Sequence, residues 1–153
     1  MGLLTPLAVR VGSISWMPNL LPQIVMVDKL LQRVTLHRYT ILDVAGLPNL
    51  VLTVTGRKSG LPRSTPLLCV PDGARVLVAG SNFGGPKEPL WVKNIEADPH
   101  VSVRIHGVET KRVAAMLEGD DRARAWKIML GVWPNFAKYE ERTDRAIKVF
   151  QLS

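Results

Sequence analysis

Apolar residues recur every three or four positions between Asn19 and about Leu36, which predicts an amphipathic helix near the start of the chain. The apolar face of this helix comprises Leu20, Ile24, Val27, Leu31 and Val34. The polar residues Asp28, Lys29, Gln32 and Arg33 fall largely elsewhere. We therefore expect the apolar face to pack against the core. Contact with a membrane surface stays open, because amphipathic helices serve both purposes.

From Asn49 the pattern changes to short extended runs of β-branched and apolar residues. These runs are NLVLTVT (49–55), STPLLCV (64–70) and RVLVAGS (75–81). A basic, glycine-containing turn separates the first two runs, and Pro-Asp-Gly separates the last two. Short connections of this kind predict an antiparallel meander of three strands.

The second half of the chain alternates helical and extended segments. The expected elements are a short helix at PLWVKNIEA (89–97), a hairpin of HVSVRIH and VETKRVAAML around His106 and Gly107, a helix over 120–132, a short helix from Pro134 to about Arg142, and a last strand at AIKVFQL. In the 120–132 helix, Ala123, Trp126 and Leu130 fall on one face. About six strands with few helices predict an α+β fold centred on a small barrel, since closure removes unpaired sheet edges.

Length and composition set wide limits on function. The 153 residues suit a single domain, 1–153, and the lone Cys69 excludes an intramolecular disulfide. The three histidines do not recur at zinc-ligand spacing, so we expect no metal site. The net charge of +7 favours anionic partners without choosing among phosphates, carboxylates, nucleic acid and a membrane surface. Prolines and Arg10 interrupt the apolar residues 1–27, so no membrane-spanning helix is expected.

Familiar catalytic motifs are missing from the sequence: it has no GxSxG, HExxH, Walker loop or GxGxxG. Three other segments carry candidate chemistry. In TGRKSGLPRSTP (55–66), glycines permit close backbone approach to a ligand, and the charged and hydroxyl side chains suit a phosphate: Arg57, Lys58, Ser59, Arg63, Ser64 and Thr65. A solvated basic turn is an equal alternative for this segment.

The other two segments contain small and aromatic residues. In AGSNFGGPKEPLW (79–91), Ala79, Gly80 and Ser81 at a strand end would let a flat ring lie against the backbone. In VWPNFAKYEERTDR (132–145), Trp133, Phe136 and Tyr139 are spaced three apart and are expected on one helix face. That face is either core or the lid of an apolar substrate pocket, to which Tyr139 adds a phenolic hydroxyl.

Taken in order, the segments TGRKSGLPR, LLCVPDG, RVLVAGSNFGGPKEPLW, NIEADPHVSV and WPNFAKYEERTDR resemble the deazaflavin-dependent nitroreductase family, which uses coenzyme F420, an 8-hydroxy-5-deazaflavin. The resemblance covers roughly residues 50–150, and residues 1–48 match only loosely, as a variable helical amino-terminal segment. It implies a split β-barrel related to flavin reductases and pyridoxamine-phosphate oxidases. It also implies a protein of the cytoplasm, with possible contact between its amino-terminal helix and the inner face of the membrane.

The resemblance further implies which residues bind the coenzyme. Phosphate and tail contacts are expected from the basic turn, and the ring is expected beside Pro66, Leu67, Ala79, Gly80, Ser81 and Asn82, with Leu90, Trp91 and Asn94 as its further wall. Asn82 stands where relatives often have lysine. A deazaflavin carries the hydride chemistry itself, so the protein needs neither a triad nor a metal.

The expected acceptor is a quinone-like molecule such as menaquinone, or a nitroaromatic compound. Nitroimidazole-reducing members have a tyrosine-rich cluster, but here only Tyr139 of the three matching positions keeps a hydroxyl, so Trp133, Phe136 and Tyr139 favour a quinone. Ser81 and Tyr139 are the catalytic candidates, because their hydroxyls can help to protonate an acceptor oxygen. The alternatives are a non-catalytic carrier of coenzyme F420 or a fatty acid, and an FMN-dependent reductase. Nucleic-acid binding is not expected, since no aromatic residues interleave with the basic turn.

Overall fold

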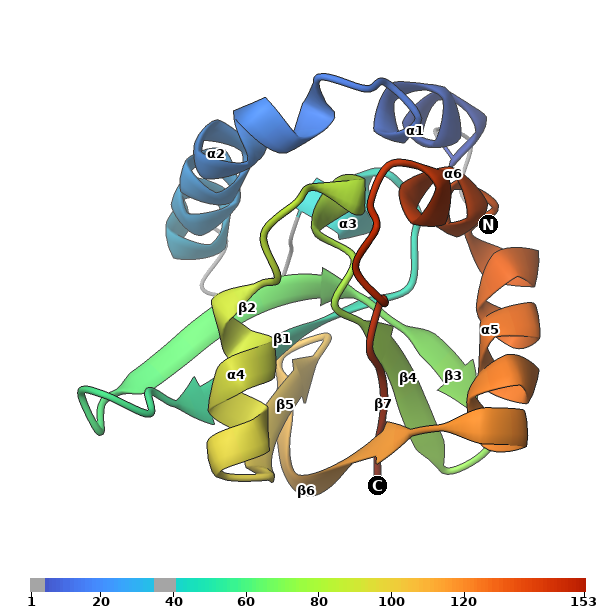
Figure 1. Cartoon of the computed structure of the whole chain (residues 1–153). Helices are drawn as coiled ribbons and strands as arrows, with labels where there is room; N and C mark the ends of the chain where they lie inside the picture. Colours follow the sequence, from blue (N-terminus) through green and yellow to red (C-terminus); the bar gives the residue numbers. More distant parts are fainter. Residues whose placement is uncertain (1–4, 35–40) are drawn as a thin grey trace.

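The computed structural model describes residues 5–34 and 41–153, and it contains one curled antiparallel sheet with helices around it (Figure 1). The seven strands are β1 (Asn49–Thr55), β2 (Pro62–Leu68), β3 (Val70–Asp72), β4 (Arg75–Ala79), β5 (His100–Ile105), β6 (Val108–Leu117) and β7 (Val149–Leu152). The helical elements are α1 (Thr5–Gly12), η1 (Met17–Leu20), α2 (Leu21–Val34), α3 (Ile41–Val44), η2 (Asn82–Gly84), α4 (Leu90–Ala97), α5 (Gly119–Val132) and α6 (Asn135–Glu141). The predicted α+β class is confirmed.

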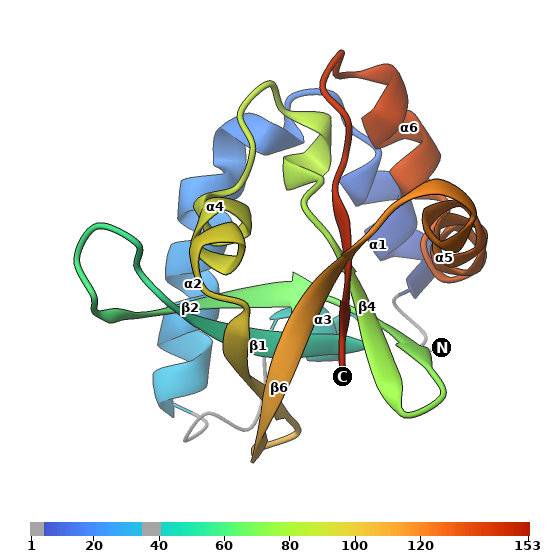
Figure 2. The same ribbon diagram turned by 60° about the horizontal axis from the view of Figure 1, so that its bottom comes forward.

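The strand order β2-β1-β5-β6-β7-β4-β3 explains why the sheet curls. The strands β2 and β3 form opposite edges of the sheet, yet only Cys69 separates them in the chain. The two edges must therefore approach each other, and Figure 2 shows the sheet bending from β1 through β6 to β4. The predicted three-strand meander is wrong, because β1–β2 and β3–β4 form separate hairpins. The run 64–70 contributes to two strands, which gives seven strands instead of about six.

The core has two parts, one on each side of the sheet. Alternate residues of β1, Leu50, Leu52 and Val54, point to the inside of the curl and pack with Trp91 of α4 and Phe150 of β7. A second cluster lies beneath α5 and α6 and includes Trp126, Met129 and Phe136. The sequence therefore places apolar residues on both faces of several strands, which explains the near-continuous burial of β1.

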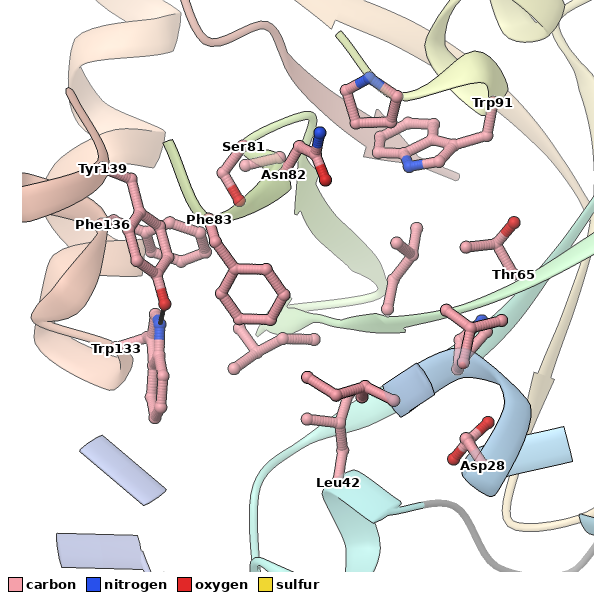
Figure 3. A pocket seen from close by; sticks show the side chains of 17 residues that line it. Asp28, Leu42, Thr65, Ser81, Asn82, Phe83, Trp91, Trp133, Phe136 and Tyr139 are labelled. Atoms are coloured by element: carbon pink, nitrogen blue, oxygen red, sulfur yellow. Dashed lines mark hydrogen bonds between the residues drawn. The ribbon is translucent and has the colours of Figure 1, made fainter. Parts of the chain in front are cut away.

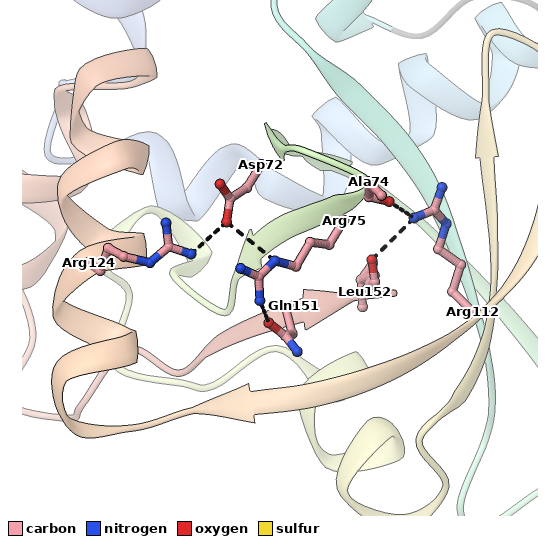
Figure 4. Close-up of polar contacts among 7 residues, drawn as sticks. All are labelled: Asp72, Ala74, Arg75, Arg112, Arg124, Gln151 and Leu152. Carbon is pink, nitrogen blue, oxygen red and sulfur yellow. Dashed lines mark hydrogen bonds and ion pairs between the residues drawn. The ribbon is translucent and has the colours of Figure 1, made fainter.

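Polar contacts fix the β3–β4 hairpin against its neighbours (Figure 4). Asp72 binds Arg124 of α5 at 2.8 Å, and Arg75 donates to Gln151 of β7 at 2.6 Å. Arg112 of β6 donates to the carbonyl oxygen of Ala74 at 2.9 Å. These contacts hold α5 and the carboxyl-terminal strand next to the hairpin that leads into the candidate site.

The helix predicted over Asn19–Leu36 is confirmed as η1 and α2 within the described residues, and its last two residues lie outside them. The predicted buried face is only partly correct, because Leu20, Ile24 and Leu31 are half-buried and the other two residues are exposed. Val27 and Val34 are 50% and 75% exposed, whereas Asp28 and Gln32 are buried. The physical reason is the surface that α2 covers, where Arg104 donates a hydrogen bond to Gln32 and Gln32 in turn donates to Asp28.

The other helices and strands also follow the predicted segments. The helix at 89–97, the hairpin at His106 and Gly107, the helix at 120–132, the short helix after Pro134 and the last strand are all confirmed. His106 and Gly107 both have positive φ, at 49° and 82°, as a two-residue hairpin turn requires. In α5 the buried residues are Ala125, Trp126 and Met129, while Ala123 is exposed, so the predicted face is rotated toward Met129.

Candidate functional site

A cavity of about 210 Å³ opens among α2, β2, η2, α4 and the α5–α6 corner (Figure 3). Its lining is mostly apolar, and the polar groups are spread around it. Ten residues singled out in the sequence meet there: Thr65, Pro66, Leu67, Ala79, Ser81, Asn82, Trp91, Trp133, Phe136 and Tyr139. Segments separated by up to 74 positions in the sequence therefore form one concave site, of the kind that binds a small molecule.

The basic residues of the β1–β2 turn lie outside this cavity. Arg57, Lys58, Ser59, Arg63 and Ser64 are all exposed on the turn or at the start of β2. The strand β2 runs from this turn directly to Thr65 in the cavity wall. A ligand with an apolar ring and an anionic tail can therefore extend from the cavity along β2 to the basic turn.

The remaining predicted contacts are placed differently. Leu90 is 69% exposed and does not line the cavity. Asn94 is buried, and its Oδ1 accepts a hydrogen bond of 3.1 Å from the backbone N–H of Arg57. Asn94 thus joins α4 to the basic turn. Sequence reasoning identified it as a ligand contact, and its observed contact is with the backbone.

Two arginines of the carboxyl-terminal segment hold the loop 80–87. Arg145 donates to the carbonyl oxygens of Gly80, Ser81 and Gly85 at 3.0, 2.9 and 3.2 Å. Arg142 donates to the carbonyl oxygen of Phe83 at 3.2 Å. Desolvation lowers the pKa of Arg145, against an opposing effect of Glu88. These hydrogen bonds hold the loop that carries Ser81, and neither arginine lines the cavity.

Asn82 has an unusual backbone and a buried acceptor. Its φ is 47° and that of Phe83 is 53°, in the left-handed region that asparagine tolerates better than most residues. The amide group Nδ2 donates to the carbonyl oxygen of Lys87 at 2.9 Å, whereas the buried Oδ1 has no hydrogen-bond partner among the described residues. A buried acceptor of this kind in a cavity wall fits a ligand that presents an N–H or O–H group.

Gly80 allows a close approach of backbone and helix. A Cβ atom at this position would lie 2.7 Å from Cγ2 of Val92. The absence of a side chain therefore lets the residue after β4 pack directly against α4, and Gly80 itself does not line the cavity.

The aromatic side of the cavity is built from α6 and from the residue that follows α5. Trp133 follows the end of α5, while Phe136 and Tyr139 belong to α6, so the expected single helix face is wrong for Trp133. The indole N–H of Trp133 donates to the hydroxyl of Tyr139 at 3.2 Å (Figure 3). Burial raises the pKa of Tyr139 to about 12, against the opposing effects of Trp133 and Arg142, so the phenol stays protonated at neutral pH.

Sequence reasoning missed the contribution of α2 to the cavity. Ile24, Val25 and Asp28 line it from the amino-terminal side, together with Leu42 of α3. The signal was present, because Asp28 and Gln32 are four residues apart and so share one side of the helix. Within the described residues, 5–34 and 41–153, no helix is long and apolar enough to cross a membrane.

Comparison with known proteins gives consistent results. A family model described as "F420H(2)-dependent quinone reductase" matches residues 31–153. An enzyme of Mycobacterium tuberculosis strain H37Rv with the same description is 35% identical over 111 residues, which cover 69% of this chain and 73% of that protein.

Two solved structures are also similar to this chain. A coenzyme F420-dependent reductase is 37% identical, with a TM-score of 0.65 and coverage of 69% of this chain and 94% of that one. A second chain, described as a domain-swapped dimer, is 33% identical, with a TM-score of 0.67 and coverage of 84% and 97%.

Proposed function

The chain belongs to the family of F420H(2)-dependent quinone reductases, and we propose from this that it oxidises reduced coenzyme F420 and passes the hydride to a quinone, with menaquinone as the physiological class of acceptor. The observation that carries the proposal is the apolar cavity that continues along β2 to the basic turn. The enzyme is then an oxidoreductase with coenzyme F420 as its cofactor.

The residues present fit this coenzyme. The unpartnered Oδ1 of Asn82 suits an N–H group of the deazaflavin, and Thr65, Pro66, Leu67 and Ala79 form a wall for its ring. Arg57, Lys58 and Arg63 supply positive charge for its phosphate and acidic tail. When bound, the deazaflavin supplies a hydride from its ring carbon.

The chain's own residues provide the surroundings for the transfer. The apolar lining and the aromatic side chains of Trp133 and Phe136 exclude water and suit the flat ring of a quinone. Reduction of a quinone to a quinol needs a proton as well as a hydride. The hydroxyls of Ser81 and Tyr139 line the cavity and can hydrogen-bond the acceptor oxygen as it gains negative charge.

The direct test is anaerobic mixing of the protein with reduced coenzyme F420 and a soluble menaquinone analogue. Absorbance of the oxidised coenzyme reports each turnover. We expect turnover with the quinone and little with a nitroimidazole, because two of the three aromatic positions lack a hydroxyl. Tight coenzyme binding without reduction of any quinone would favour a carrier, and preference for FMN in a parallel titration would indicate a conventional flavin reductase.

We further propose that α2 contacts a membrane surface, from which a lipid-soluble quinone would be supplied. The outward side of α2 exposes apolar residues, namely Met26, Val27, Leu30 and Val34. The exposed Lys29 and Arg33 lie on the same helix and suit anionic headgroups.

Sedimentation with anionic phosphatidylglycerol vesicles tests this contact. The variant Leu30→Gln/Val34→Gln is expected to sediment less than the wild type. The matched control is Val108→Gln/Val113→Gln, which removes two exposed valines of β6. Equal sedimentation of all three proteins would contradict the proposal.

A further inference from the structure

A carboxylate lies in the apolar wall of the cavity. Asp28 of α2 is 2% exposed and lines the cavity beside Ile24 and Val25. In Figure 3 it lies below Thr65, on the opposite side of the view from Trp133 and Tyr139. Neither the proposed hydride transfer nor the protonation of the acceptor uses this residue.

Two further side chains fix the position of Asp28. Nε2 of Gln32, one turn along α2, donates to Oδ2 of Asp28. Oε1 of the same Gln32 accepts a hydrogen bond of 3.2 Å from Nη2 of Arg104 on β5. The amide of Gln32 is therefore oriented by the arginine, so that its donor faces the carboxylate. This arrangement links α2 to the sheet and sets the orientation of Asp28.

Burial of a carboxylate in the wall of an apolar cavity costs free energy. Moving a charged group out of water carries a penalty that hydrogen bonds only partly offset, and well-packed apolar residues often stabilise a fold as well or better. An aspartate held in this orientation therefore suits recognition of a ligand as well as attachment of α2 to the sheet. A carboxylate accepts hydrogen bonds and repels negative charge, so it selects ligands with N–H or O–H groups.

We propose that Asp28 makes the cavity bind reduced coenzyme F420 more tightly than the oxidised form, an inference that rests on the function proposed above. The 8-hydroxyl of the oxidised deazaflavin is acidic, because its negative charge spreads through the conjugated ring system. Reduction interrupts that conjugation, restores a neutral hydroxyl and adds an N–H group to the ring. The reduced form thus offers more donors and less negative charge to Asp28 than the oxidised form does.

The selection has a direct consequence for turnover. Loss of the hydride turns a favoured ligand into a disfavoured one, so the oxidised coenzyme leaves the site more readily. The carboxylate thereby separates substrate from product by charge, although the two forms have nearly the same shape.

Anaerobic calorimetric titration of the full-length protein with reduced and with oxidised coenzyme F420 tests the inference without any acceptor. The wild type is expected to bind the reduced form about tenfold more tightly, as one hydrogen bond to a charged group would provide. Equal affinities would overturn the inference and leave the proposed function intact. No binding of either form would overturn both.

The variant Asp28→Asn keeps the size of the side chain and removes its charge. Its preference for the reduced form is expected to fall about tenfold, to near equality. The matched control is Asp120→Asn, the same chemical change on the exposed first turn of α5, which should keep the wild-type preference. A folded Asp28→Asn protein that kept the preference would overturn the inference. If this variant does not fold, the wild-type ratio of affinities decides.

Discussion

Asn82 illustrates how a single residue combines backbone strain with an unused acceptor. The left-handed backbone at φ 47° and the buried Oδ1, which has no partner in the part of the chain that the structure describes, each cost stability in the free protein. Both become useful if the side chain meets a donor on the coenzyme. The contact with Lys87 leaves Oδ1, and not Nδ2, to face such a donor.

The variant Asn82→Gly is expected to weaken coenzyme binding about tenfold. Glycine adopts the same φ without strain, so the free energy of unfolding should change by no more than about 1 kcal/mol. Calorimetric titration and thermal melting measure the two effects. Unchanged affinity would show that the buried oxygen of Asn82 does not contact the coenzyme.

The hydrogen bond between Trp133 and Tyr139 gives a second prediction about single residues. The variant Tyr139→Phe removes the hydroxyl that accepts the indole N–H. We expect turnover with quinone to fall at least tenfold, coenzyme affinity to stay nearly unchanged, and stability to drop by about 1 to 3 kcal/mol because a buried donor loses its acceptor.

The double variant Trp133→Phe/Tyr139→Phe separates the two effects of Tyr139→Phe. It leaves no unpaired indole N–H, so part of the stability should return while turnover stays low. Recovery of turnover in the double variant would remove the proposed role of the phenol. Because the pKa of Tyr139 is raised to about 12, its ionisation should not limit turnover below about pH 11.

At the scale of elements, the loop 80–87 depends on the carboxyl-terminal segment for its shape. The sequence predicted the strand before this loop from its β-branched and apolar residues, and the helix after it from Pro89 in the first turn. It did not predict that Arg145 holds the loop, since a contact between residues 65 positions apart leaves no local pattern. Asp28 and Gln32 were misplaced for the same reason, because burial of polar side chains depends on the partner across the interface.

The variant Arg145→Met keeps an unbranched side chain and removes three hydrogen bonds to the loop. We expect faster amide hydrogen exchange over residues 80–87, weaker coenzyme binding, and a loss of about 1 to 3 kcal/mol of stability. The control Arg124→Met breaks an exposed ion pair with Asp72, away from the loop. Similar exchange in both variants would contradict the role of Arg145.

The link between β2 and β3 gives a prediction about pH. Cys69 is buried there, and burial, assisted by Asp43, raises the pKa of its thiol from 9.0 to about 12. Above pH 9 the unfolded chain releases the thiol proton while the folded chain keeps it, so stability falls as pH rises. The expected loss is about 2 to 3 kcal/mol by pH 11 and is absent below pH 9.

Comparison with Cys69→Ala isolates this contribution. The variant should be less stable than the wild type at pH 7, because it leaves a small cavity. Its stability should decline less steeply between pH 9 and 11. Denaturant unfolding at each pH measures the free energy, and parallel declines in the two proteins would exclude the thiol as the cause.

At the scale of the whole molecule, the segments that carry the site were predictable and their arrangement was not. Pattern and turn chemistry placed the strands, and ten of the named residues meet in one cavity. The curl that brings the two edge strands together at Cys69 and the wall formed by α2 depend on contacts between distant segments. The number of short strands predicted a small barrel, and the resemblance to a known family specified a split barrel.

The net charge of +7 and the apolar cavity predict that the two substrates respond differently to salt. An anionic coenzyme is attracted by the exposed basic turn, so an increase in salt should weaken its binding severalfold. A neutral quinone enters an apolar cavity, so its KM should change little. Titrations and steady-state kinetics at low and high salt measure both.

Two double variants with the same change in net charge separate the local effect of the turn from the global effect. Lys58→Ala/Arg63→Ala should lose most of the coenzyme affinity and most of its salt dependence while keeping the wild-type melting temperature, because both residues are exposed. Lys111→Ala/Lys127→Ala removes two exposed charges elsewhere and should retain nearly all of the affinity. If the two variants lost affinity equally, the attraction would come from the charge of the whole protein, and the turn would have no specific part in binding the coenzyme.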